Sequence, residues 1–161
     1  MRNRLRYWLI RRVLKSAAAF EEDLSAAYAN LLDELEHSDA RTRIERLQAE
    51  EKQHLAVIRR LSRGPAADEE LERLISHTHF HNPDEVAPLD PAVRAAFAEQ
   101  LEHLHKLERD SYIFYSNLAR MSKIQVVKKS FSFLADQERE HLQILQRLLG
   151  GAEDPEAAKK S

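Results

Sequence analysis

The chain has 161 residues, 43% of them hydrophobic, which is enough for one domain with its own core. Its 25 basic and 27 acidic residues give a net charge of −2, so the overall charge balance excludes the strongly basic character of a nucleic-acid-binding protein. The absence of cysteine excludes disulfides, zinc–thiolate sites and thiol catalysis, and we expect a cytoplasmic protein.

Only 3 glycines and 5 prolines interrupt a chain rich in helix-forming residues, so we expect an all-α fold. The first predicted helix covers residues 3–36. Its beginning, residues 1–15, combines six basic side chains with a Trp and several aliphatic residues. This segment fits either a helix extension that packs on a neighbouring subunit or a basic amphipathic helix that contacts a membrane surface or a partner.

Ser38 and Asp39 are capping candidates for a second helix, which should end near Gly64 and Pro65. About 25 residues follow, with one short helical candidate at 68–76. Within this connection, alternate positions carry histidine, and the tract fits either a metal-binding segment or a solvated loop. These residues are His77, His79 and His81.

Asp90 followed by Pro91 predicts the start of a third helix, over 91–121. Ser122 and Gln125 match a capping box that opens a fourth helix, which should stop at Gly150. We therefore expect residues 1–150 to form the folded domain and residues 151–161 to form a disordered polar tail.

Two polar residues interrupt the apolar face of the fourth helix, in the stretch LADQEREHLQIL. Glu138 and His141 are three residues apart and project from the same side of the helix. The stretch LQAEEKQHLAVI repeats this arrangement in the second helix with Glu51 and His54. A buried carboxylate or imidazole without a partner would cost several kcal/mol, roughly, so both pairs call for a partner such as a metal ion.

The two halves of the chain are related by a shift of 87 residues, which is 138 minus 51 and 141 minus 54. The same shift superposes Glu21 on Glu108 and Tyr28 on Tyr115, and it gives 12 identities over residues 21–64. We infer an internal repeat of two helices. The expected inward set is Glu21, Glu51, His54, Glu108, Glu138 and His141.

Other residues near these positions have simpler explanations. Two further Glu-x-x-His pairs, beginning at Glu34 and Glu102, fall outside the apolar stripes and the repeat, so we interpret them as surface residues. Tyr28 and Tyr115 are expected either to hydrogen-bond ligand carboxylates or to be core aromatics that bond water. His105 either supports the site or is a boundary histidine satisfied locally.

A Glu from each of two helices and a Glu-x-x-His from each of two others is the ligand pattern of ferritin-like di-iron and di-manganese bundles. The chain resembles this di-iron carboxylate superfamily, and ERDSYIFYSNLA followed by SFLADQEREHLQIL looks most like rubrerythrin-like members that lack the rubredoxin domain. The resemblance implies a four-helix bundle with a long crossover between helices 2 and 3 and internal two-fold pseudo-symmetry. It also implies that Glu51 and Glu138 bridge two metal ions. Ser111 departs from the pattern, because rubrerythrins carry a further Glu at that position.

The expected function is that of a non-haem di-iron protein with two Fe ions per chain, or Mn in their place, that reacts Fe(II) with O2 or H2O2 as a ferroxidase or peroxide scavenger. An external electron donor would supply electrons. The alternatives are a non-catalytic metal-binding bundle that docks through its basic first helix, manganese catalase-like activity, and a bundle whose Glu and His residues form ordinary buried salt bridges. We expect a homodimer or higher homo-oligomer.

Overall fold

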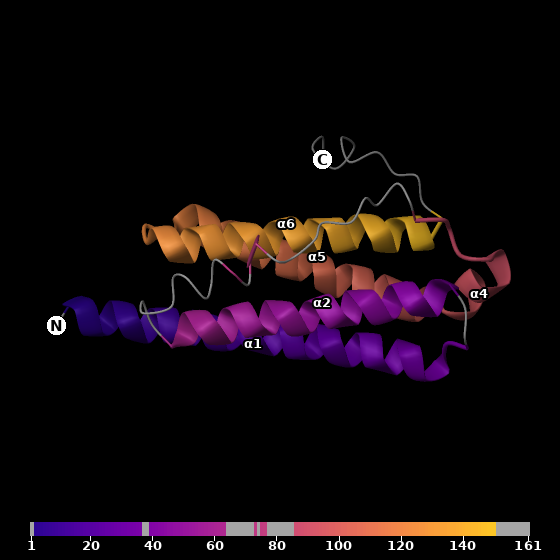
Figure 1. Cartoon of the computed structure of the whole chain (residues 1–161), viewed down its shortest axis with the longest axis horizontal. Helices are drawn as coiled ribbons and strands as arrows, with labels where there is room; N and C mark the ends of the chain where they lie inside the picture. The colour runs from indigo at the N-terminus through magenta and orange to yellow at the C-terminus, as the bar shows by residue number, and fades with distance from the viewer. Residues whose placement is uncertain (1, 37–38, 64–72, 74, 77–85, 151–161) are drawn as a thin grey trace.

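The computed structural model describes residues 2–36, 39–63, 73, 75–76 and 86–150, and within them the chain is all-α (Figure 1). The predicted fold class is confirmed. Four long helices form a bundle, and a short helix precedes the third of them. Their bounds are α1 Arg2–Glu34, α2 Asp39–Ser62, α4 Pro91–Ala96, α5 Ala98–Met121 and α6 Gln125–Leu148.

The bundle consists of two antiparallel pairs, α1 with α2 and α5 with α6. The pairs pack together through contacts of α1 with α5 and of α2 with α6. α2 and α5 run in the same direction, so α2 ends at the opposite end of the bundle from the start of α4 (Figure 1). The predicted crossover between them, with its three histidines, lies largely outside the described residues, as does the predicted tail. The crossover and the two-fold pseudo-symmetry therefore stay predictions.

The third helix differs from the prediction, because it is interrupted at Phe97. It begins as expected: the carboxylate of Asp90 accepts a hydrogen bond from the backbone N–H of Ala92 at 2.8 Å, and Pro91 occupies the first turn. At Phe97, φ of −115° and ψ of 14° depart from helical values and separate α4 from α5. Phe97 is partly buried against the core, so the break accompanies the packing of this ring.

The predicted capping box at the start of α6 is wrong. Its N-cap is Ile124, which has no side-chain cap hydrogen bond. Ser122 instead ends α5, where its backbone N–H bonds the carbonyl of Leu118 at 2.9 Å and its hydroxyl accepts from the N–H of Ile124 at 3.3 Å. The predicted stop is confirmed, because α6 ends at Leu148 and is followed by Gly150 with a φ of +75°, a backbone conformation that glycine tolerates.

The core has two apolar clusters, one toward each end of the bundle, and every long helix contributes to both. On α1, Leu14 and Ala17 belong to one cluster, Leu24 and Leu31 belong to the other, and Glu21 lies between them in the chain. α6 has the same order, and α2 and α5, which run the opposite way, have the reverse order with their buried Glu or His residues again between the two clusters. The buried polar residues therefore form a layer at mid-bundle that apolar side chains separate from water on both sides.

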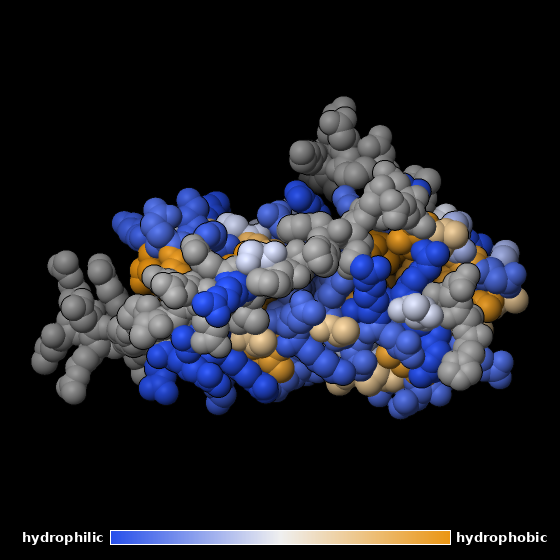
Figure 2. All heavy atoms as spheres, viewed as in Figure 1, coloured by the Kyte–Doolittle hydropathy of each residue, from blue (hydrophilic) through white to orange (hydrophobic). Residues whose placement is uncertain are grey.

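The outer surface is consistent with this interior. The described residues present mostly hydrophilic side chains on the face shown in Figure 2. Among the described residues, no helix combines the length and the apolar character that crossing a membrane requires.

Candidate metal centre

The bundle brings all six predicted inward residues together in its polar middle layer. Each has a relative exposure of 0%, although all six carry carboxylate or imidazole groups that are ordinarily solvated. They form two groups of four, in which the candidate ligand atoms lie within 4.8 Å of one another. One group is Glu21, Glu51, His54 and Glu138, and the other is Glu51, Glu108, Glu138 and His141.

Glu51 and Glu138 belong to both groups, so each could contact two cations at once. The remaining members divide evenly, with Glu21 and His54 on one side and Glu108 and His141 on the other. The layout arises because α2 and α6 each place a Glu and a His one turn apart, while α1 and α5 each add one Glu. The arrangement has the form of two adjacent cation positions with two shared carboxylates.

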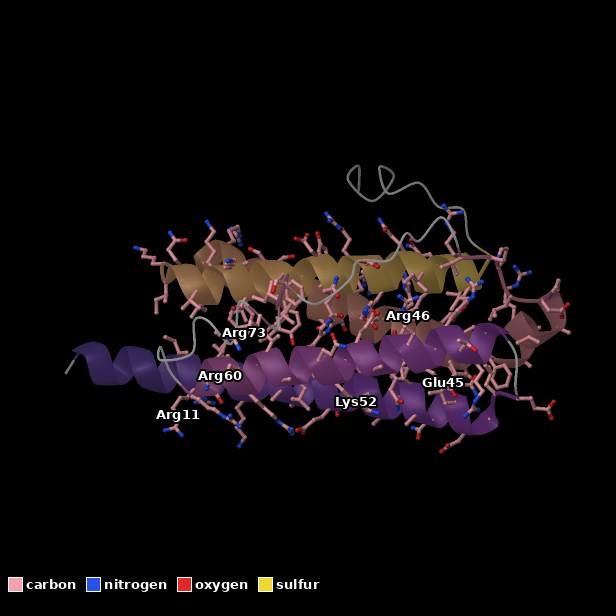
Figure 3. The ribbon with its side chains drawn as sticks, viewed as in Figure 1. Arg11, Glu45, Arg46, Lys52, Arg60 and Arg73 are labelled. Atoms are coloured by element: carbon pink, nitrogen blue, oxygen red, sulfur yellow. The ribbon has the colours of Figure 1, made fainter. Side chains whose placement is uncertain are left out.

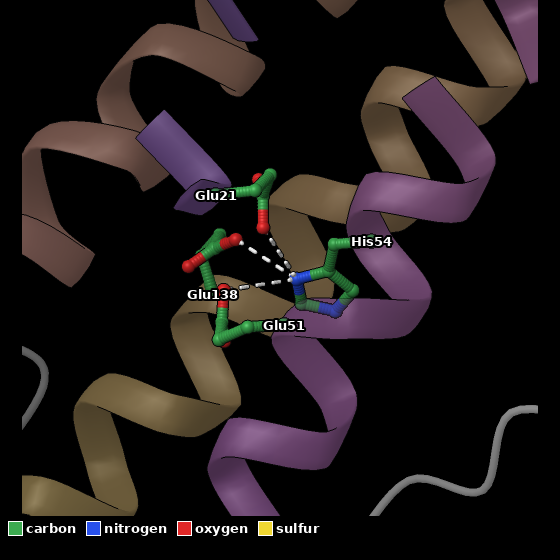
Figure 4. A group of neighbouring side chains, drawn as sticks. All are labelled: Glu21, Glu51, His54 and Glu138. Atoms are coloured by element: carbon green, nitrogen blue, oxygen red, sulfur yellow. Dashed lines mark ion pairs between the residues drawn. The ribbon is translucent and has the colours of Figure 1, made fainter. Parts of the chain in front are cut away.

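Both histidines turn the same ring nitrogen, Nδ1, toward the carboxylates. Nδ1 of His54 lies 3.2 Å from Oε1 of Glu138, 3.4 Å from Oε2 of Glu21 and 3.5 Å from Oε2 of Glu51 (Figure 4). Nδ1 of His141 lies 2.7 Å from Oε1 of Glu51 and 3.4 Å from Oε1 of Glu108. The two rings stack with their centroids 5.3 Å apart. Nδ1 is therefore the donor atom that each imidazole offers to the centre.

Many of these atoms lack a hydrogen bond although they are fully buried. Within the part of the chain that the structure describes, both oxygens of Glu51 and of Glu138 have no hydrogen-bond partner, and neither does Nδ1 of either histidine. Buried polar groups are normally satisfied, so a cluster of buried donor atoms without hydrogen bonds is what a cation site would present. Carboxylate and imidazole donors suit iron or manganese, and the residues present fit two such ions.

The electrostatics of the protein without metal show how strongly this site needs positive charge. Burial, together with the charge of Glu51, raises the pKa of Glu21 to about 8. Burial also raises the pKa of Glu138 well above its ordinary value, and the charges of Glu51 and Glu108 act in the same direction. Near neutral pH, the carboxylate of Glu21 therefore keeps a proton that it would lose in water.

The pKa values of the two histidines shift in the direction opposite to the one that burial favours. Burial alone would lower the pKa of His54 and of His141, but the neighbouring carboxylates outweigh it and raise both well above the ordinary value. For Glu51, burial would raise the pKa, yet the charges of the two histidines hold it below its ordinary range. Protons on imidazoles and carboxylates therefore balance the charge where cations could do so instead.

Two buried tyrosines each donate a hydrogen bond to a carboxylate of the centre, and in each case the carboxylate belongs to the other half of the chain. Tyr28 of α1 donates a hydrogen bond to Oε1 of Glu108 on α5, and Tyr115 of α5 donates to Oε1 of Glu21 on α1. Burial and the adjacent carboxylate raise the pKa of both phenols well above the ordinary value. Both tyrosines therefore act as neutral hydrogen-bond donors that orient their carboxylates.

The structure does not bring every candidate to the site. His105 is half-buried on α5 and belongs to neither four-residue group. Glu34 and Glu102, from the two other Glu-x-x-His pairs, are exposed, which agrees with their interpretation as surface residues. His77, His79 and His81 lie outside the described part of the chain.

Sequence reasoning missed two buried polar residues, of which Glu50 contacts the centre and Gln137 adjoins it in the sequence. Oε2 of Glu50 lies 2.9 Å from Nε2 of His141, on the side of the ring that faces away from the carboxylate cluster. Gln137 is 1% exposed and occupies the position that the 87-residue shift pairs with Glu50. Their adjacency to Glu51 and Glu138 in the sequence was the signal that could have identified them.

Comparison with known proteins agrees with the geometry. The family model described as Rubrerythrin matches residues 66–160, which is more than half of the chain and includes α4, α5 and α6 with Glu108, Glu138 and His141. Searches of curated proteins and of solved structures found no match. The bundle, the two carboxylate–histidine groups and the family match lead to one conclusion: the chain belongs to the rubrerythrin family.

Proposed function

We propose that this protein is a di-iron oxidoreductase that binds two Fe(II) ions and reacts them with O2 or H2O2, as a ferroxidase or a peroxide scavenger. The observation that carries this proposal is the pair of four-residue groups that share Glu51 and Glu138 and contain buried donor atoms without hydrogen bonds. Glu21 with His54 would hold one ion, and Glu108 with His141 would hold the other. Bound iron supplies the electrons for reduction of the oxidant.

The protein's own contribution is a preorganised and dry site. Four carboxylates compensate the charge of two cations, and two of them are fixed by Tyr28 and Tyr115. The apolar clusters on either side exclude bulk water, so a small neutral oxidant can enter more readily than a charged one. The protons that the metal-free site holds on Glu21 and the histidines leave when metal binds.

The test is an anaerobic Fe(II) titration of metal-free protein, followed by air or peroxide while the near-ultraviolet absorbance of ferric iron is recorded. We expect a break at about two Fe per chain and an absorbance rise on oxidation. Glu51→Ala and Glu138→Ala should each abolish two-metal loading, whereas Glu102→Ala, at an exposed Glu, should load normally. Full stoichiometry in both of the first variants would overturn the assignment.

A second candidate function, docking to an anionic surface, has one observation in its favour. A cavity of about 450 Å³ is lined by residues of α1 and α2. One of them, Arg11, lies near the end of α1 that projects beyond α2 (Figures 1 and 3). The lining of the cavity combines apolar side chains with four basic ones. The basic residues are Arg11, Arg12, Lys15 and Arg59, and the apolar ones are Leu14, Ala18 and Ile58. Such a surface suits anionic lipid headgroups beside acyl chains.

Flotation with vesicles that contain anionic phosphatidylglycerol tests this second role. We expect the protein to float with anionic vesicles at low salt and to be released by high salt, with no flotation on neutral phosphatidylcholine vesicles. The combined Arg11→Gln, Lys15→Gln and Arg59→Gln variant should lose flotation and keep its metal stoichiometry. If this variant floats as well as the wild type, the cavity is not the surface that binds the vesicles.

A further inference from the structure

The two histidines of the centre differ in the hydrogen-bond partner of one ring nitrogen, the one that faces away from the centre. For His141, Nδ1 faces Glu51 and Glu108, while Nε2 lies 2.9 Å from the carboxylate of Glu50. Both residues are buried, with exposures of 7% for Glu50 and 0% for His141. A carboxylate accepts the Nε2–H of a neutral imidazole, which fixes the tautomer and leaves the lone pair of Nδ1 free to bind a cation.

Among the described residues, His54 has no equivalent partner. Its Nδ1 faces three carboxylates, and the other ring nitrogen points away from them (Figure 4). The 87-residue shift that pairs His54 with His141 pairs Glu50 with Gln137 (137 minus 50). Nε2 of His54 and Oε1 of Gln137 are both buried, and neither has a hydrogen bond within the described structure. The two halves thus offer the same inner residues, but within the described structure only His141 has a carboxylate at its outer ring nitrogen.

The difference is one of charge as well as of hydrogen bonding. Glu50 can carry a full negative charge beside His141, whereas the amide of Gln137 is neutral. A carboxylate behind an imidazole increases the electron donation of the ring toward a metal, and loss of such a partner costs about 10- to 100-fold in metal affinity. Glu50 also lies near Arg46, whose Nε is 3.6 Å from Oε1 of Glu50, but Arg46 is mostly exposed and its charge is largely screened (Figure 3).

We infer that the two metal positions are unequal: the position formed by Glu108 and His141 binds the first cation, and the position formed by Glu21 and His54 binds the second and more weakly. Glu50 is the positioning residue that creates this order. The inference rests on the proposed two-metal function and adds the sequence in which the positions fill.

Anaerobic titration with Co(II), followed by its visible absorption, tests the order without redox chemistry. Wild-type protein should bind two Co(II) ions in two steps whose dissociation constants differ at least about 10-fold. Glu50→Gln should weaken the first step by about 10- to 100-fold and merge it with the second. The reciprocal Gln137→Glu should strengthen the second step. His54→Ala should keep the tight step, and His141→Ala should keep only the weak one.

Arg46→Gln provides the matched control, because it removes the ion pair between Arg46 and Glu50 and leaves the contact of Glu50 with His141. This variant should retain the two wild-type steps. Two equal steps in the wild type, or an unchanged first step in Glu50→Gln, would overturn the inference while leaving the two-metal site intact. Wild-type protein that fails to bind two ions at all would instead overturn the proposed function. Circular dichroism of each metal-free variant verifies that the helices are retained.

Discussion

Tyr28 of α1 donates its hydroxyl hydrogen bond to Glu108 of α5, 80 residues away in the chain. α1 and α5 run antiparallel, so the reciprocal bond from Tyr115 to Glu21 forms between the same two helices (Figure 1). Each tyrosine lies seven residues after the Glu of its own helix, which is two turns away and beyond the reach of its hydroxyl. The antiparallel neighbour places the other Glu at the right height. These bonds join the two helix pairs at the level of the candidate metal centre.

Replacing Tyr28 with Phe should destabilise the metal-free protein by about 1–3 kcal/mol, because it leaves a buried carboxylate oxygen without its donor. The midpoint of thermal unfolding should fall by several degrees, at roughly 2–4 °C per kcal/mol for a chain of this size. Tyr112→Phe is the control. Tyr112 is half-buried on the same helix as Glu108, and its hydroxyl makes no hydrogen bond within the described residues. Equal melting of the two variants would contradict the role assigned to the Tyr28 hydroxyl.

Metal loading should raise the stability of the protein substantially. The free energy of unfolding should increase by about 2.7 kcal/mol at a free metal concentration 100-fold above the dissociation constant. Thermal unfolding in the presence of Mn(II), and again after a chelator is added, measures the effect. Glu45→Gln, at a half-exposed carboxylate, should show the full shift, whereas Glu51→Ala should show a much smaller one. A full shift in Glu51→Ala would place the stabilising metal elsewhere.

The inner residues of the site could be predicted because helical periodicity and the internal repeat both indicate the same positions. Glu138 and His141 stand in an apolar stripe, and the shift of 87 residues carries them onto Glu51 and His54. Burial within a stripe depends on local spacing, which the sequence records directly. The structure places all of these side chains in one buried layer.

The outer neighbours could not be predicted, because their environment depends on which helix packs against them. Glu50 is one residue before Glu51, about 100° around α2, and reads as a position outside the apolar stripe. It is nevertheless buried, because α6 covers that side and brings His141 to it. The break at Phe97 likewise accompanies tertiary packing of its ring. At Ser122, the hydroxyl makes a local hydrogen bond with Ile124 in place of the predicted cap.

Arg41 should prove important for the turn between α1 and α2. Its Nη1 donates to the carbonyl oxygens of Leu32 at 2.5 Å and Leu35 at 2.7 Å, which lie at the end of α1, where carbonyls lack helical partners. Arg41→Gln should therefore lower the free energy of unfolding by about 1–3 kcal/mol in urea denaturation. Arg43→Gln, two residues along the same helix, should change it by less than about 0.5 kcal/mol. Similar losses in both variants would indicate a general effect of charge instead of this capping contact.

Metal binding should become tighter as the pH rises, because cations must displace protons from the site. The pKa of Glu21 is raised to about 8, so the metal-free protein retains this proton near pH 7, and the pKa values of Glu138, His54 and His141 are shifted in the same direction. For groups of this kind, the stabilisation that the proton provides is complete below the unfolded-state pKa and is lost as the pH rises through the folded-state value.

Two consequences can therefore be measured together. Between pH 6 and 8.5 the metal-free protein should unfold more easily as the pH rises, while the apparent affinity for Mn(II) should increase. Calorimetric titrations in buffers of different ionisation enthalpy give the number of protons released on metal binding. Glu21→Gln should release about one proton fewer than the wild type, because the amide has no proton to give up to the metal. Binding heats that are the same in every buffer would show that the site is already deprotonated before metal arrives, in conflict with the raised pKa of Glu21.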